Sequence, residues 1–201
     1  MKTKQPFHHG SLKQALLDAS GALLDQQGPE GVTIRAIARE VGVSHAAPVN
    51  HYKDREALLT ALATVLFKDI LASVQEKLSD KNLPASTRIS AFAIVLFEYA
   101  MAYPNRYRLL WHTGLVNHDD PELLDVMDQF YNACRAEIAG AGLCSEQDTE
   151  TYAIALWSLV HGYTDLRLTG MFEAKNDTIS GRPRLEAMLD MFLNPSHAKS
   201  P

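Results

Sequence analysis

The segment "TIRAIAREVGVSHAAPVNHYKDREALL", residues 33–59, contains the signals that decide the fold. Thr33 stands where a helix N-cap is expected, and apolar residues then recur at helical spacing as far as Gly42. Ser44 can cap a second short helix, and Asp54 can cap a longer one. Two short helices that are joined by a tight turn containing glycine and followed by a long helix are typical of a helix-turn-helix motif.

Pro48 lies inside the second of these short helices. If Ser44 is the cap, Pro48 is the fourth helical residue. The amide that proline lacks would then have been the first to bond back within the helix, to the Ser44 carbonyl. We therefore expect a short, slightly kinked helix that loses one hydrogen bond.

The residue types in this segment suit contact with DNA. In a helix-turn-helix the first short helix crosses the DNA backbone and the second lies in the major groove. Hydroxyl and cationic side chains at the helix ends can bind phosphates, and the small alanines at 46 and 47 allow a close approach to base edges. His45, Asn50 and His51 can supply hydrogen bonds to bases.

The ordered run also resembles the TetR family of bacterial transcriptional regulators. That family has a Thr-capped helix with "IA", then "GVS", a recognition helix that ends in a Tyr-x-His-Phe type segment, and a Lys or Arg before "EAL". At Val49 and Asn50 this sequence departs from the aromatic and the basic or polar residue that the family often has. From the residue types and the resemblance together we expect the DNA-binding residues to be Thr33, Arg35, Ser44, His45, Ala46, Ala47, Pro48, Val49, Asn50, His51, Tyr52 and Lys53.

Composition limits the protein classes that are open to this chain. It has 201 residues, of which 46% are hydrophobic, enough to bury a substantial core. The net charge is −5, yet residues 1–60 hold seven basic and six acidic side chains, so the acidic excess lies in the remainder. Cys134 and Cys144 have no metal-binding spacing, and no apolar run approaches the roughly 20 residues that cross a bilayer. We expect a cytoplasmic protein with no cofactor, no metal and no membrane partner.

Helix punctuation recurs along the whole chain, and strand signals are nearly absent. The sequence therefore predicts an all-α protein of about nine helices. We expect a helix-turn-helix DNA-binding domain at 8–55, a long connecting helix at 56–80, and a helical domain at 84–195.

Two aromatic stretches in the C-terminal half, "YAMAYPNRYRLLWHTG" at 99–114 and "ALWSLVHGYTDLRLTG" at 155–170, resemble the Trp-His-Gly type of C-terminal domain found in part of the TetR family. The resemblance implies that this half binds a small-molecule effector and forms a homodimer. An apolar cavity with aromatic walls suits a mostly hydrophobic ligand. The residues expected to bind it are Phe97, Met101, Trp111, His112, Leu115, Trp157 and His161.

In the family, the last two helices form the dimer. The residues expected at this interface are Tyr163, Leu166, Leu185, Met188, Leu189 and Phe192. A twofold dimer would place two recognition helices about 34 Å apart, opposite the two halves of a pseudo-palindromic operator in double-stranded DNA.

Other functions remain open at this stage. An enzyme could use His112, or His161 with Asp165, but the sequence lacks a nucleophile elbow, a phosphate loop and paired catalytic carboxylates, so we assign no catalytic residue. A metal-sensing regulator could use His112, His118, Asp119, His161 or the two cysteines, although no spacing matches a ligand set. A purely structural helical protein would not explain residues 33–58. The sequence favours a DNA-binding regulator, most simply a repressor that its effector releases.

Overall fold

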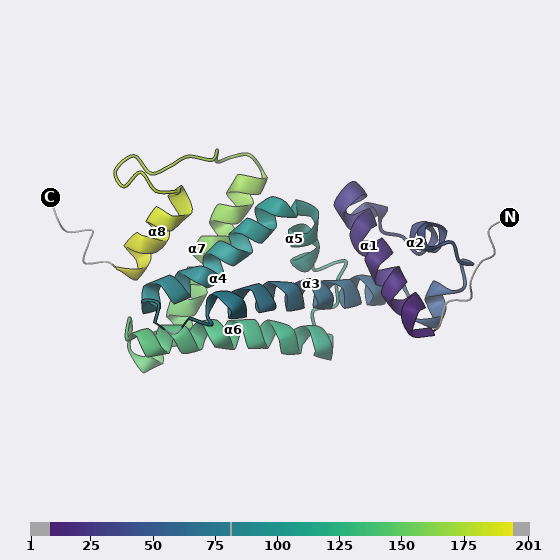
Figure 1. Ribbon diagram of the computed structural model, residues 1–201, viewed down its shortest axis with the longest axis horizontal. Coiled ribbons are helices and arrows are strands. Elements are labelled where there is room, and N and C mark those ends of the chain that lie inside the picture. Colours follow the sequence, from purple (N-terminus) through teal and green to yellow (C-terminus); the bar gives the residue numbers. More distant parts are fainter. Residues whose placement is uncertain (1–8, 81, 195–201) are drawn as a thin grey trace. The chain divides into compact units, whose positions relative to one another are not determined.

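The computed structural model describes residues 9–80 and 82–194, and within them the chain forms eight α-helices (Figure 1). They are α1 (His9–Gly31), α2 (Ile34–Val41), α3 (Arg55–Lys77), α4 (Ala85–Ala102), α5 (Pro104–Leu110), α6 (Pro121–Ala141), α7 (Thr149–Leu168) and α8 (Arg184–Leu193). Two 3₁₀ turns, η1 (Pro48–Asn50) and η2 (Glu146–Asp148), complete the described elements. The predicted all-α class is confirmed.

One helix differs from the expectation. The third predicted helix, at Ser44 to His51, is a 3₁₀ turn instead of an α-helix, so eight α-helices form in the described residues where about nine were expected. Helix α1 continues to Gly31, past a kink at Gly28 that has φ 71°. Glycine tolerates this left-handed φ because it has no Cβ.

The chain divides into two compact units. The first takes the described residues of Met1–Phe67 together with Tyr103–Asp125, and the second takes those of Lys68–Ala102 together with Val126–Pro201. Helices α3 and α6 therefore each contribute residues to both units. The domains expected from sequence were consecutive segments of the chain, whereas each of these units combines segments that are separated in the sequence. Residue 8, the expected start of the first domain, lies outside the described residues.

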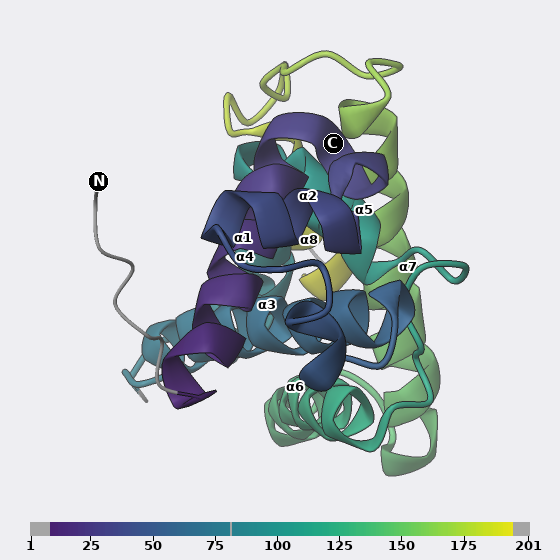
Figure 2. The same cartoon turned by 90° about the vertical axis from the view of Figure 1, so that its right-hand side faces the viewer.

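In the first unit, α1, α2 and the start of α3 share a core. Leu16 and Leu24 of α1, Ile37 of α2 and Leu58 of α3 are fully buried, as the helical spacing of these apolar residues requires. Helix α2 lies against α1 (Figures 1 and 2). Burial of a leucine or isoleucine side chain contributes about 1.5–3 kcal/mol, so this cluster contributes several kcal/mol, on the order of 6–12, to the folded unit.

The second unit buries the facing sides of α4, α6, α7 and α8. Edge-to-face aromatic contacts link three helices: the ring centroids of Phe92 and Phe130 are 5.4 Å apart, and those of Phe130 and Trp157 are 5.7 Å apart. One face of α8 is buried through Leu185 and Leu189, four residues apart. Because these contacts bury one face of α7 and one face of α8, the opposite face of each helix lies at the surface of the unit.

Helices α3 and α4 are long and apolar enough by composition to cross a membrane, which the sequence inspection did not identify. In α3, however, 61% of the apolar window is buried inside the protein, and in α4 39% is. A buried core helix passes the same test, so this composition is weak support for a membrane span.

Candidate nucleic-acid interface and effector site

Helix α2 is fixed at both ends by caps that the sequence predicted. The Thr33 hydroxyl accepts a hydrogen bond from the Ala36 amide at 3.1 Å. Gly42 ends the helix in the left-handed conformation with φ 74°, and the Val43 amide donates to the Ala38 carbonyl at 2.9 Å. The turn that leads into the recognition segment is thereby defined within one or two residues.

The recognition segment, residues 44–52, has the hydrogen bonds of tight turns. The Ala47 amide donates to the Ser44 carbonyl and the His51 amide to the Pro48 carbonyl, each bond spanning three residues. The kinked α-helix expected here is therefore wrong. Since Pro48 has no amide to offer the Ser44 carbonyl, Ala47 takes that acceptor and winds the chain more tightly.

Most of the residues expected to bind DNA are at the surface. Eight are exposed: Thr33, Arg35, Ser44, His45, Ala46, Val49, Asn50 and Lys53. Ala47 and His51 are half-buried. The exposed set offers hydroxyl, imidazole, amide and cationic groups within one contiguous motif, as contact with phosphates and base edges requires.

Pro48 and Tyr52 point the other way and are buried in the first unit. Only 5% of Tyr52 is exposed, its hydroxyl has no hydrogen-bond partner among the described residues, and burial raises the pKa of Tyr52 to about 12. A phosphate contact by this hydroxyl does not agree with its position. Pro48 and Tyr52 instead anchor the recognition segment to the core.

Lys13 of α1 is a cation near this segment that sequence reasoning missed. Its Nζ lies 5.9 Å from the centroid of the Tyr52 ring, and the residue is exposed. The two residues are distant in the chain, so no local pattern could have paired them. Lys13 adds a positive charge to the expected DNA-facing side.

The second unit contains an apolar cavity that could hold an effector. It is lined by Phe92, Ala93, Leu96, Phe130, Tyr131, Cys134, Ala153, Leu156, Trp157 and Val160, which come from α4, α6 and α7. The volume that the centre of a water molecule can occupy in this cavity is about 20 Å³, which is close to the volume needed to hold one water. The cavity is therefore small, and a larger ligand would have to displace side chains. Burial raises the pKa of the Cys134 thiol to about 12, so this group stays neutral in the wall.

The seven residues expected to bind the effector are not gathered in this cavity. Only Trp157 lines it. Phe97 contacts Tyr163 elsewhere in the second unit, with 5.6 Å between the ring centroids and a tilt of 35° between the rings. Met101 is half-buried. Trp111, the exposed His112 and Leu115 all belong to the first unit.

His161 lies against Trp157, with 4.6 Å between the ring centroids. Burial lowers the pKa of His161 from 6.5 to about 4, because the charged imidazolium loses hydration inside the protein. The imidazole is therefore neutral at pH 7.

The residues expected at a dimer interface divide into two groups. Tyr163, Leu185 and Leu189 are buried within their own unit, which leaves them little surface for a partner. Leu166, Met188 and Phe192 are half-buried.

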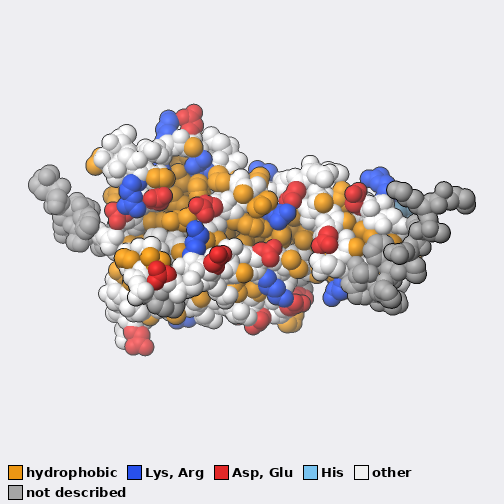
Figure 3. All heavy atoms as spheres, in the orientation of Figure 1, with side chains coloured by type: hydrophobic (Ala, Val, Ile, Leu, Met, Phe, Trp, Pro, Cys, Tyr) orange, Lys and Arg blue, Asp and Glu red, His pale blue; other side chains and the backbone are white. Residues whose placement is uncertain are grey.

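Two large apolar side chains on the same helices are more exposed than these, and sequence reasoning missed them. Ile154 of α7 is 51% exposed and Met191 of α8 is 66% exposed. Figure 3 shows hydrophobic side chains at the surface of the second unit, between scattered charges.

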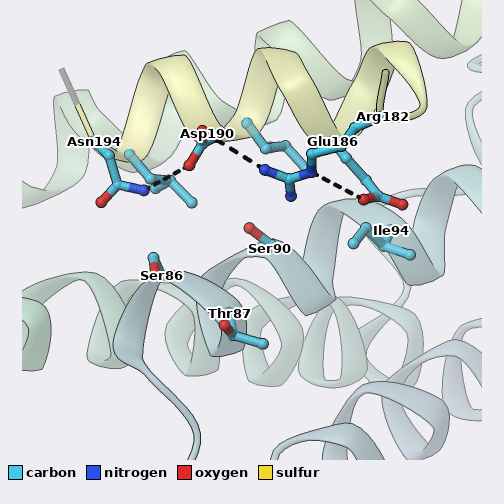
Figure 4. Close-up of a pocket in the computed structure, with 10 residues that line it drawn as sticks. Ser86, Thr87, Ser90, Ile94, Arg182, Glu186, Asp190 and Asn194 are labelled. Atoms are coloured by element: carbon cyan, nitrogen blue, oxygen red, sulfur yellow. Dashed lines mark hydrogen bonds and ion pairs between the residues drawn. The ribbon is translucent and has the colours of Figure 1, made fainter. Parts of the chain in front are cut away.

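A polar groove of about 340 Å³ lies between the start of α4 and α8 (Figure 4). Arg182 reaches Glu186 at 3.5 Å and Asp190 at 3.6 Å across its rim, while Ser86, Thr87 and Ser90 line the opposite wall. The single cation of the groove, Arg182, is shared between two carboxylates, which leaves the groove with a net charge of −1. No group of three or more His, Cys, Asp or Glu side chains that could hold a metal occurs in the part of the chain that the structure describes.

Family models match both parts of the chain. Residues 16–62 match the "Bacterial regulatory proteins, tetR family" model, and residues 89–192 match the "Tetracyclin repressor-like, C-terminal domain" model. The second match does not confirm the expected Trp-His-Gly subtype.

Relatives and solved structures agree with these matches. An HTH-type transcriptional regulator of Bacillus subtilis, YobS, is 25% identical over 85% of this chain and 86% of its own. A solved protein of unknown function from Rhodococcus sp. RHA1 is 28% identical, with a TM-score of 0.78 over 96% of this chain and 98% of that one. BioQ, solved with its double-stranded DNA operator, shares the fold at 18% identity, with a TM-score of 0.63 over 94% of this chain and 98% of its own.

The members of the matched family, and YobS among the relatives, are transcriptional regulators and not enzymes. Together with the helix-turn-helix geometry of residues 33–52, the matches identify the protein: this chain belongs to the TetR family of bacterial transcriptional regulators.

Proposed function

We propose that this protein is a ligand-responsive transcriptional repressor that binds a pseudo-palindromic DNA operator as a homodimer. It acts in the bacterial cytoplasm, where its operator is located. The observation that carries the proposal is the recognition segment, in which Pro48 and Tyr52 are buried while His45, Val49 and Asn50 are exposed. The buried pair holds the turn, and the exposed residues remain available to base edges.

Phosphate contacts would come from the residues that flank this segment. Arg35 on α2 and Lys53 before α3 are exposed cations, and Thr33 lies at the N-terminus of α2, where backbone amides and the helix dipole favour an anion. These contacts supply affinity for any DNA, whereas the recognition segment supplies the preference for one sequence.

The effector is a small, mostly apolar and uncharged molecule. The cavity of α4, α6 and α7 supports this, because its walls are almost wholly hydrocarbon and aromatic, with Cys134 neutral. Since the cavity is small, a ligand larger than one water must displace side chains that line it. Such a ligand can release DNA only if it binds the displaced arrangement more tightly than the arrangement that binds DNA.

Homodimerisation rests on the outer faces of α7 and α8. Ile154 and Met191 together with the half-buried Leu166, Met188 and Phe192 offer apolar surface on both helices. A partner copy would bury this surface, and a twofold axis would bring two recognition segments to the two half-sites.

Electrophoretic mobility shift of the DNA upstream of the gene tests the function. We expect retardation at nanomolar protein, with affinity that falls steeply as salt rises and a protected palindrome in footprinting. Equal binding to any duplex at all salt concentrations would refute sequence-specific regulation. An apolar compound that fills the cavity should release the operator, and identical operator binding by free and ligand-saturated protein would refute the effector role.

A further inference from the structure

Arg55 is a basic residue next to the recognition segment, yet its side chain is directed inward. It is the first residue of α3 and is half-buried. Its Nε donates to the Val32 carbonyl at 2.6 Å, and its Nη2 donates to the Pro29 carbonyl at 2.6 Å. Two short bonds from one planar guanidinium fix both the direction and the distance of the group that they hold.

These bonds close the helix-turn-helix motif. Val32 precedes the cap of α2, and Arg55 follows the end of the recognition segment by three residues. Every residue from Thr33 to Lys53 that we expect to bind DNA therefore lies within the loop of chain that Arg55 closes. The side chain joins the two ends of the part of the protein that reads DNA.

The Val32 carbonyl needs such a donor because of the local backbone. The kink at Gly28 interrupts the hydrogen-bond ladder of α1, and Val32 lies in the connection before α2 begins, where its carbonyl takes no part in that helix. Val32 is fully buried, so water has poor access to this connection. A buried acceptor without a donor is costly, and the guanidinium satisfies the Val32 carbonyl. It also gives a second donor to the Pro29 carbonyl, which accepts the Val32 amide at 3.2 Å.

The position of Arg55 itself, at the start of α3, is also fixed. The Asp54 carboxylate accepts the Ala57 amide at 2.8 Å and caps α3, which sets the position of Arg55 at the first turn. The chain between Tyr52, which is buried, and Asp54 contains only Lys53, which is exposed. Arg55 and Lys53 thus carry the same charge, but the Arg55 side chain binds backbone carbonyls of the same unit whereas Lys53 is exposed to solvent.

We propose that Arg55 is a positioning residue that holds the recognition segment in the shape its operator requires, without itself contacting phosphate. This role rests on the proposed DNA-binding function. If Arg55 acts in this way, its loss weakens the fit to the operator, whereas nonspecific attraction to the phosphate backbone persists. Lys53 is the matched control, because its loss removes a phosphate contact from every duplex.

The test compares wild type, Arg55→Ala, Arg55→Lys and Lys53→Ala on the footprinted operator and on a scrambled duplex, from about 50 to 200 mM salt. We expect Arg55→Ala to lower operator affinity about tenfold, with scrambled-duplex affinity held within about twofold and the slope of log affinity against log salt unchanged. Lys53→Ala should weaken binding to both duplexes and make that slope shallower by about 1.

Arg55→Lys separates charge from geometry. Lysine keeps the positive charge but cannot make two hydrogen bonds in a fixed fork, so it should behave like alanine. Full operator affinity in Arg55→Lys would overturn the proposal, as would a shallower salt slope in Arg55→Ala, which indicates a phosphate contact. Equal loss on both duplexes would indicate general destabilisation and would overturn it too. Wild-type protein that fails to distinguish operator from scrambled DNA would instead remove the proposed function itself.

Discussion

At the scale of single residues, the Tyr52 hydroxyl is the group whose surroundings most change the expectation from sequence. It is buried and has no hydrogen-bond partner among the described residues. We expect Tyr52→Phe to raise the free energy of unfolding by about 1 kcal/mol, because the desolvated hydroxyl is removed while the ring remains. Urea unfolding measures this change, and operator affinity should stay within about twofold of wild type. Weaker operator binding without a change in stability would restore the phosphate contact first expected for this residue.

His161 gives the protein a specific sensitivity to acid. Its pKa is lowered to about 4 in the folded protein, so the unfolded chain binds a proton more readily. The stability that this group contributes is present above its ordinary pKa of 6.5 and is lost as pH falls toward 4, by up to roughly 3 kcal/mol. We expect His161→Phe to flatten the decline of stability between these pH values in chemical denaturation. An unchanged pH profile in the variant would show that other groups cause the decline.

At the scale of helices, α5 is held to α1 by an ion pair of good geometry. Arg106 donates to both oxygens of Asp25, at 2.8 and 2.6 Å, and Asn105 donates to the Asp25 carbonyl at 3.2 Å. We expect Arg106→Ala to lower the free energy of unfolding by about 1 kcal/mol, because the pair is partly buried and bidentate. Thermal or urea denaturation would measure the loss.

A matched ion pair controls this prediction. Lys77 and Glu98 are 3.9 Å apart and largely exposed, so Lys77→Ala should change stability by no more than a few tenths of a kcal/mol. If both variants lose the same free energy of unfolding, the bidentate geometry of the Arg106–Asp25 pair does not add to stability. A larger loss for Arg106 alone would mean that α5, which follows α4 directly, is a firm part of the DNA-binding unit.

At the scale of the whole molecule, the proposed dimer depends on apolar side chains that the monomer leaves outside. We expect Ile154→Asp and Met191→Asp to convert a dimer into a monomer in sedimentation, because each would place a carboxylate in the apolar contact. Operator affinity should fall with dimerisation, since a single recognition segment reads only one half-site.

Ile179 offers a control within the same unit. It is 96% exposed and lies in the connection between α7 and α8, so it belongs to neither helix. Ile179→Asp should leave the protein dimeric. If Ile179→Asp were monomeric while Ile154→Asp and Met191→Asp remained dimeric, the interface would lie at the connection and not on the faces of α7 and α8.

Local signals explain what could be predicted. Thr33 caps α2 and Gly42 ends it as expected, since each interaction spans only a few residues. The same local reasoning failed at Pro48, where the balance between a kinked α-helix and a 3₁₀ turn depends on one missing amide. It also could not assign the effector residues, because aromatic residues at helical spacing occur in ordinary cores and in cavities alike.

The sequence by itself determined the all-helical class and the position of the DNA-reading motif, together with the TetR resemblance that the family matches bear out. Only the tertiary structure decided that Tyr52 faces inward, that Arg55 clasps Pro29 and Val32, and that Trp157 shares a cavity with Phe92 and Cys134. The physical reason is range. Caps and helical periods depend on neighbours in the chain, whereas burial, cavities and clasps depend on residues brought together from distant positions.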